Sequence, residues 1–410
     1  MTGPMIGMNV KTDADTSRKV QVLRALAIIA VVAIHTCPSG LPQVIVRPFV
    51  NFGVGLFLFL SGWLTRENDF GKSFFKRRIF RVLVPYVIWT VVYSLQRGAP
   101  DKILFNLLTT KACAAFYYVA VYVQFVLLTP LLCRLADSRF RHAGWLVAPI
   151  SVLAFMYLPH FGVCEPGEHM SLVWNICCLG WFTYYYLGIM CARGYVRVEG
   201  YRPLILVAVY LLTLVVQMAE GYAWLQAGYA NIGSQLKLSS LASGAVAMLL
   251  ALCYLHSARP ASVPSSRPFE SAPILFPGSP AESVSVPSSR PCLSSGSSAE
   301  SASIPSSRPC LSSGSSEPVP ATSSRSSEPV SGGLRCHFAG IASCLIQIGD
   351  FSFGIYLTHI LLIRILSGTA FYSALPFGVN TLLILMLSLA LVMLLSKIIG
   401  PRLSRLLGLR

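Results

Sequence analysis

The sequence contains few charged residues. Asp, Glu, Lys and Arg make up 12% of the 410 residues, hydrophobic residues make up 54%, and the mean hydropathy is +0.64. Soluble domains usually carry about 25% charged residues. This composition therefore argues against a large soluble protein, and apolar runs along nearly the whole chain predict a polytopic membrane protein. We see no cleavable signal peptide, because the first apolar run is not followed by a small-residue cleavage site.

Cysteine patterns that hold metals or disulfide frameworks are also missing. The twelve cysteines form no CxxC pair, and only Cys37, Cys113 and Cys164 lie where they could face an oxidising exterior. At most one disulfide is expected. The single cluster of metal-ligating types fits no common ligand spacing and is expected to be a solvated loop: His160, Glu165, Glu168 and His169. We therefore expect no metal site.

Acidic residues are half as frequent as basic ones. The chain has 16 Asp and Glu against 32 Lys and Arg, a net charge of +16 and a pI of about 9.5. The basic residues are scattered in short loops between apolar runs, which argues against nucleic-acid binding. Their distribution is typical of an orientation signal, because cytoplasmic loops carry excess Lys and Arg. Attraction to anionic membrane lipids is a further consequence.

Apolar runs predict an all-α polytopic protein of about ten transmembrane helices. The candidate spans lie at approximately 20–37, 50–65, 82–97, 114–132, 144–159, 174–191, 203–220, 236–256, 346–367 and 376–397. With both termini placed in the cytoplasm, 25 of the 32 basic residues fall on the cytoplasmic side, and Arg24 and Arg364 lie within spans. The other five fall outside: Arg47, Arg97, Lys102, Lys111 and Lys237. An even number of spans with both termini cytoplasmic follows.

One segment, 257–335, interrupts this pattern. The string PSSRPCLSSGSS occurs at 287–298 and again at 305–316, and Ser, Pro, Arg and Gly dominate the segment. With almost no apolar residues to bury, it is predicted to be a disordered cytoplasmic loop. The predicted organisation is a cytoplasmic tail, spans 1–8, this loop, spans 9–10 and a basic cytoplasmic tail: 1–19, 20–256, 257–335, 336–397 and 398–410.

The first apolar run begins with Arg24 and ends with His35. Eleven helical steps bring the two side chains to within about 20° of one face, separated by roughly 16 Å along the axis. They are too far apart to bond each other, so they serve two places on one face. Each alone could lie at the membrane surface, but ionisable groups inside spans usually face an interior or a wet cavity. His35 can take a proton from a hydroxyl or carry an acyl group, and Arg24 can hold a phosphate or carboxylate.

The loop predicted at 66–81 is the most basic short loop, and it interleaves Lys and Arg with Phe. Arg78 and Arg81 would share one face of a helix. One interpretation is a positive-inside anchor with aromatic side chains at the interface. The other is an anion site, because paired guanidinium groups suit phosphates.

At these positions the sequence resembles the integral-membrane acyltransferase-3 family. Arg24 and His35 match its R-x10-H signature, and Arg78 and Arg81 match an R-x-x-R element in FFKRRIFRVLVPYVIW at 74–89. Further blocks follow in the family's order: GVGLFLFLSGWL at 53–64, YYYLGIMCARGY at 184–195, and IGDFSFGIYLTHILLI at 348–363, with its Tyr-Leu-x-His element.

The resemblance implies a bacterial inner-membrane enzyme that moves an acyl group, commonly acetyl, from acetyl-CoA to a sugar hydroxyl. The implied acceptors are surface polysaccharide, lipopolysaccharide or a lipid-linked precursor. It assigns His35 as the base or acyl relay, Arg24 as its donor-side partner, and Arg78 and Arg81 as contacts for the CoA phosphates. A transporter or flippase for a small molecule or lipid-linked sugar is the rival hypothesis. The sequence shows no pair of Gly/Pro-interrupted spans in two matching halves, which such carriers usually have.

Three residues of the late block are candidate acceptor contacts. His359, three residues after Tyr356, either packs against a neighbouring carbonyl or hydroxyl or lies beside the acceptor. Arg364 either binds an acidic sugar or extends to the membrane surface. Nearby polar residues have simpler interpretations: Asp350 as a helix N-cap, Ser61-Gly62 as a site of close helix approach, and Tyr184–Tyr186 as interfacial side chains.

Deletion of 257–335 is expected to leave acyl transfer largely intact, because the segment has nothing to bury. Transfer would be compared in membranes that contain equal amounts of the full-length and shortened proteins. A collapse of activity at normal expression would contradict the interpretation of a passive insertion.

Overall fold

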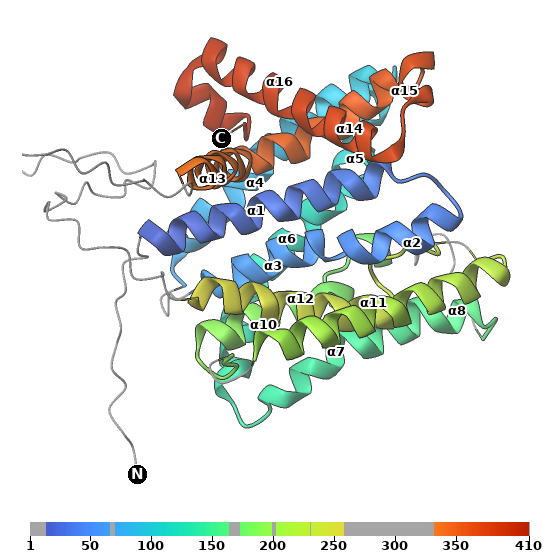
Figure 1. Ribbon diagram of the computed structural model, residues 1–410, viewed down its shortest axis with the longest axis vertical. Helices are drawn as coiled ribbons and strands as arrows, with labels where there is room; N and C mark the ends of the chain where they lie inside the picture. Colours follow the sequence, from blue (N-terminus) through green and yellow to red (C-terminus); the bar gives the residue numbers. More distant parts are fainter. Residues whose placement is uncertain are drawn as a thin grey trace, which may run out of the picture. The chain divides into compact units, whose positions relative to one another are not determined.

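The computed structural model describes residues 14–65, 70–163, 173–198, 202–229, 231–257 and 332–409, with side chains from 340 onward in the last range. These residues form helices and connecting turns without a strand (Figure 1). The principal helices are α1 Ala14–Thr36, α2 Leu41–Val50, α3 Phe52–Trp63, α4 Lys72–Gln96, α5 Ile103–Thr109, α6 Tyr117–Asp137, α7 Gly144–Val152, α8 Leu158–His160, α10 Phe182–Ala192, α11 Pro203–Gln226, α12 Leu238–His256, α13 Gly332–Asp350, α14 Ser352–Leu366, α15 Ala370–Ala374 and α16 Phe377–Leu406.

Eight helices in the described part of the chain are long and apolar enough to cross a membrane. A ninth span arises if α13 and α14, which are bent by 78° where they meet, count as one. The chain is therefore an all-α polytopic membrane protein. The predicted span at 174–191 differs from the others: it consists of a 3₁₀ turn at Leu179–Trp181 followed by the short helix α10.

Helix α1 forms because 14–36 contains no Gly or Pro and is rich in Ala, Leu, Ile and Val. Asp15 in its first turn pairs with Lys19 at 3.1 Å, which suits the positive end of the helix dipole. The helix ends one residue before Cys37, which precedes Pro38, and residues before proline disfavour the helical region. One unbroken helix thus carries both Arg24 and His35.

Two helices begin earlier than the hydropathy pattern indicated. The span predicted at 50–65 starts at Leu41, because α2 and α3 form one membrane-length segment interrupted at Asn51. The buried Asn51 amide donates to the carbonyl of Gly233 at 3.4 Å. The basic segment predicted as a loop is helical from Lys72, so α4 carries the basic side chains on its first turns.

Backbone contact between α3 and α10 lies at the centre of the bundle. A Cβ atom on Gly62 would lie 2.3 Å from the carbonyl oxygen of Tyr185, and one on Gly188 would lie 2.3 Å from that of Phe59. The expectation that Ser61-Gly62 permits close helix approach is confirmed. Small residues favour such contacts in membranes, where dispersion replaces the hydrophobic driving force.

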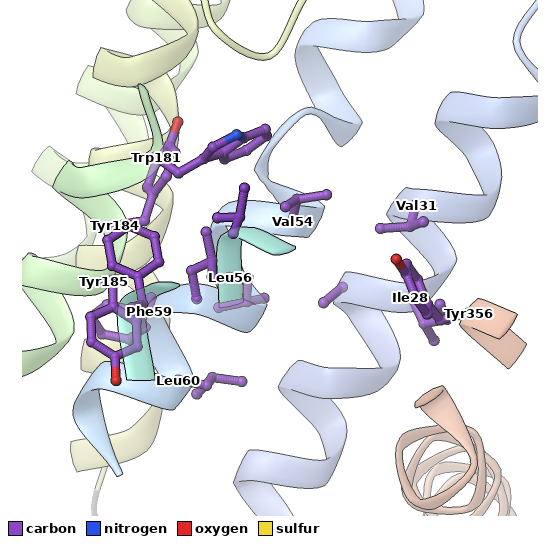
Figure 2. Packing of buried hydrophobic residues seen from close by; sticks show 14 of the residues in the cluster. Ile28, Val31, Val54, Leu56, Phe59, Leu60, Trp181, Tyr184, Tyr185 and Tyr356 are labelled. Atoms are coloured by element: carbon purple, nitrogen blue, oxygen red, sulfur yellow. The ribbon is translucent and has the colours of Figure 1, made fainter. Parts of the chain in front are cut away.

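The tyrosine triplet of α10 lies inside this contact. Tyr184, Tyr185 and Tyr186 are buried to 1% exposure or less, so the expectation that they are interfacial is wrong. Figure 2 shows Tyr184 and Tyr185 beside the Leu56–Leu60 stretch of α3, with α1 on the opposite side of α3. Each triplet hydroxyl finds a partner on another element, such as Thr129 for Tyr185 at 2.8 Å. These partners compensate the cost of burying a phenol.

Two further expectations change at the segment boundaries. Asp350 is the last residue of α13, and Phe351 occupies the N-cap position of α14, so Asp350 is not an N-cap. Helix α13 begins at Gly332, inside the range predicted for the Ser/Pro-rich segment, and the rest of that segment from 258 lies outside the described residues.

Cys37 and Cys113 are free thiols, and Cys164 is not among the described residues.

Replacing Gly188 by Ala is expected to destabilise the bundle by about 1–3 kcal/mol, because the added methyl group overlaps backbone atoms of α3. Thermal unfolding of the purified protein in detergent would show a lower Tm. Gly340→Ala is the matched control, because that helical position has open space around it. Equal Tm values for the two variants would contradict this packing.

Candidate active site

A continuous series of ring contacts leads from α6 to His35. Tyr122 and Tyr118 have ring centroids 6.1 Å apart, and Tyr118 meets Tyr356 of α14 at 5.7 Å. Tyr356 lies 6.2 Å from His359, and His359 lies 5.3 Å from His35 of α1. We call these five residues, together with Arg24, Arg78 and Arg81, the polar row. It joins side chains from four helices, α1, α4, α6 and α14.

Arg24 lies beside the α6 end of these rings. Its electrostatic neighbours are Tyr118 and Tyr122 of α6, Arg81 of α4 and Asp350 at the end of α13. The side chain is half-buried. Two guanidinium groups and one carboxylate therefore leave this region positively charged, which suits an anionic ligand.

Arg78 of α4 lies at the end of the polar row that is remote from His35. Its Nη1 donates to Thr65 Oγ1 at 2.8 Å, and its guanidinium lies 4.7 Å from the centre of the Phe74 ring. These contacts hold the group in one orientation and leave other N–H donors available. Tyr122 lies within electrostatic range of Arg78, Arg81 and Arg24, so one phenol connects all three cations.

The pair of histidines forms the other end of the row. His359 is fully buried, and its Nδ1 lies 3.0 Å from the carbonyl oxygen of Ile355. A carbonyl can only accept, so Nδ1 carries the proton and Nε2 is the unprotonated acceptor. That Nε2 has no hydrogen-bond partner within the described chain. His359 thus combines the packing role with a free acceptor beside His35, which is half-buried.

Tyr356 is held where it connects α6 to the histidines. Its hydroxyl donates to the carbonyl of Ala115, and its ring stacks on Phe353 at 5.9 Å. Arg364 is placed differently: its guanidinium donates to Gln96 Oε1 and to the carbonyl of Ala112 at 3.4 and 3.3 Å. These contacts favour a role in joining α14 to α4 over one beside His35.

Arg47 is a residue of this region that the sequence analysis missed. Its Nη2 donates to the carbonyl of Ile34 at 3.3 Å and its Nη1 to that of Gly233 at 3.4 Å. It lies within electrostatic range of His35, and its buried Nε has no partner among the described residues. The predicted span began at 50, so Arg47 was counted as a loop residue. An apolar stretch from Leu41 that includes one Arg was the available signal.

Comparison with known proteins identifies the chain. A family model described as an acyltransferase domain matches residues 18–267, which is more than half of the sequence. The chain belongs to the acyltransferase-3 family. Comparisons with curated proteins and with solved structures give no match.

This membership makes the protein a multi-pass membrane acyltransferase. Arg24, His35, Arg78 and Arg81 lie within the matched range, whereas the late block with Tyr356, His359 and Arg364 follows it. The contact between His35 and His359 therefore brings together the matched region and the part of the chain beyond it.

Groups that could hold a metal ion are absent from the described residues. Of the loop cluster named from the sequence, His160 packs its ring 4.3 Å from Trp224. Glu165, Glu168 and His169 lie outside the described residues.

Partial exposure of the row gives a direct test of its access to water. Tyr122 is half-buried, whereas Phe125, one turn along the same helix, is fully buried. The cysteine of a Tyr122→Cys variant is expected to react with a water-soluble methanethiosulfonate reagent, and that of a Phe125→Cys variant is expected to stay unmodified. Peptide mass spectrometry distinguishes either site from the native cysteines. Equal labelling at the two positions would contradict an accessible row.

Proposed function

We propose that this acyltransferase moves an acetyl group from acetyl-CoA to a hydroxyl of a surface polysaccharide, lipopolysaccharide or lipid-linked sugar precursor. One observation carries the proposal: two imidazoles lie 5.3 Å apart at the end of a row that begins with arginines. The arginines at one end of the row can bind an anionic donor, and the histidines at the other end can transfer a proton.

The arginines supply the donor side of the proposal. CoA carries several phosphate groups, and guanidinium groups bind phosphates through paired charge-assisted hydrogen bonds. Arg78 is fixed by Thr65 and Phe74, and Arg81 is exposed one turn further along α4. In this proposal both contact the CoA phosphates, and Arg24 guides the thioester arm toward His35.

His35 is the proposed base. It removes the proton of the acceptor hydroxyl while that oxygen attacks the thioester carbonyl, forming the C–O bond of a tetrahedral anion. Collapse of this anion breaks the C–S bond, and the departing thiolate takes the proton from His35 to give CoA and the ester. In the alternative course His35 attacks first, and an acyl-imidazole then passes its acyl group to the hydroxyl.

Two neighbours would assist this step. The free Nε2 of His359 can accept a hydrogen bond from one His35 nitrogen, which orients the other nitrogen toward the acceptor. Arg47 places a fixed positive charge near His35. That charge would stabilise a negative tetrahedral oxygen.

The proposed orientation follows from the basic residues. The N-terminal end of α1 and the basic first turns of α4 face the cytoplasm under the positive-inside rule. His35, at the other end of α1, then lies toward the opposite side of a bacterial inner membrane. Donor and acceptor would then approach His35 from opposite sides of the membrane.

Replacing His35 by Ala is expected to lower acetyl transfer by about 10²–10⁴-fold, which is the usual contribution of a general base. The assay follows label from radiolabelled acetyl-CoA into the lipid-linked and polymeric glycan of membranes that contain the protein. His142→Ala is the matched control, because His142 is an exposed histidine in the 3₁₀ turn Arg141–Ala143 that precedes α7.

The same assay separates the alternatives. Label that appears on the protein before the glycan supports the acyl-imidazole course, and its absence at short times supports direct proton removal. Transfer that survives His35→Ala would contradict the role of His35. A folded protein that binds acetyl-CoA and transfers nothing in either form would favour the transporter or flippase hypothesis.

A further inference from the structure

A pocket of about 580 Å³ lies where α4 begins and α6 ends. Its walls come from the start of α4, the last turns of α6 and the residue that follows α10: Phe70, Gly71, Phe75, Pro130, Cys133, Arg134, Asp137 and Arg193. Ligand pockets usually measure about 300–1,000 Å³, so this one has room for a nucleotide-sized group.

The lining combines aromatic rings with cations. Phe70 and Phe75 contribute half-buried rings, and Arg134 is exposed and forms no ion pair among the described residues. Arg193 is paired with Asp137, which also accepts a hydrogen bond from Tyr195 at 3.2 Å. The carboxylate is therefore neutralised, and Arg134 leaves the pocket with a net positive charge. Flat rings and guanidinium groups are the chemistry that binds a purine and its phosphates.

The beginning of α4 adds to the positive character of the pocket. Gly71 occupies the N-cap position of this 25-residue helix and supplies no capping side chain. The first amide groups of such a helix lie at the positive end of the helix dipole, and that of Phe74 already donates to the Gly71 carbonyl at 3.0 Å. They add to the positive potential that the arginines create at the pocket wall where Gly71 lies.

Helix α6 connects the pocket to the polar row. Cys133 of the pocket wall lies within electrostatic range of Arg78. Counting back along α6, Thr129, Tyr122 and Tyr118 follow at helical spacing on the same side as Cys133. From Cys133 to Tyr118 is fifteen residues, or about 22 Å. A ligand seated in the pocket can therefore extend an arm along α6 to the rings that lead to His35.

We propose that this pocket receives the adenosine 3′,5′-bisphosphate half of the acyl-CoA donor. The purine stacks between Phe70 and Phe75, Asp137 accepts from its exocyclic amine, and Arg134 with the α4 amides holds the 3′-phosphate. The pyrophosphate then lies toward Arg78, and the pantetheine arm follows α6. This inference rests on the proposed function in one respect, the identity of the donor as an acyl-CoA.

Arg134→Ala in the full-length protein tests the proposal. A charge-assisted hydrogen bond to phosphate corresponds to a change of about tenfold or more in affinity. The KM for acetyl-CoA is expected to rise by that factor, and inhibition by adenosine 3′,5′-bisphosphate is expected to weaken equally. Acetyl-dephospho-CoA, which lacks the 3′-phosphate, should be used equally well by wild type and variant. Arg139→Ala is the matched control, because Arg139 is exposed near the same helix end but does not line the pocket.

The possible results separate this proposal from the proposed function. Active wild type with an unchanged KM and unchanged inhibition in Arg134→Ala would overturn the pocket assignment and leave the acetyltransferase proposal intact. An effect of Arg134→Ala that vesicles of phosphatidylglycerol relieve, with no response to adenosine 3′,5′-bisphosphate, would overturn it in favour of a lipid headgroup. A wild type that binds no acetyl-CoA would overturn both.

Discussion

Close backbone contact between α3 and α10 is the constraint on which the rest of this acyltransferase depends. Gly62 and Gly188 allow the two helices to meet without intervening side chains, and α1 packs on the other side of α3. Lipid tails are apolar, so no hydrophobic driving force brings apolar side chains of neighbouring helices together. Close packing and interhelical hydrogen bonds must therefore hold the helices together. The position of α1, and with it that of Arg24 and His35, follows from this central layer. A shift of α3 would move both ends of the polar row.

Charged groups near the membrane interior are energetically costly, and this chain has several in or beside the polar row. Arg24 lies near Asp350 and two phenols, Arg47 donates to two backbone carbonyls, and Arg78 donates to a hydroxyl. Each arginine is thus compensated in part and keeps capacity for another partner. Ionisable groups inside spans are rare and usually serve a function. A bundle built only for stability would have apolar side chains at these positions, so their retention is consistent with binding of an anionic donor.

Periodicity predicted the helices well and their contacts poorly. The apolar run at α1, the shared face of Arg24 and His35, and the glycine approach at Gly62 are local features that sequence spacing encodes. The burial of Tyr184–Tyr186 depends on α3, a separate part of the chain, so their aromatic character alone indicated an interface. Arg47 was missed because hydropathy averages over a window and cannot see that α2 continues into α3 around Asn51. Similarly, no spacing rule places His359 beside His35, since helices α1 and α14 meet only in the folded protein.

The Ser/Pro-rich segment separates the two histidines in sequence, and contacts on the first turns of α1 hold the helices on either side of it. Lys19 donates to the carbonyl of Ser257 at 2.6 Å, just after α12, and Gly349 near the end of α13 packs against Gln21. Both flanking helices therefore dock on neighbouring turns of α1. Helix α14 follows directly from α13, so docking of α13 on α1 brings His359 to His35.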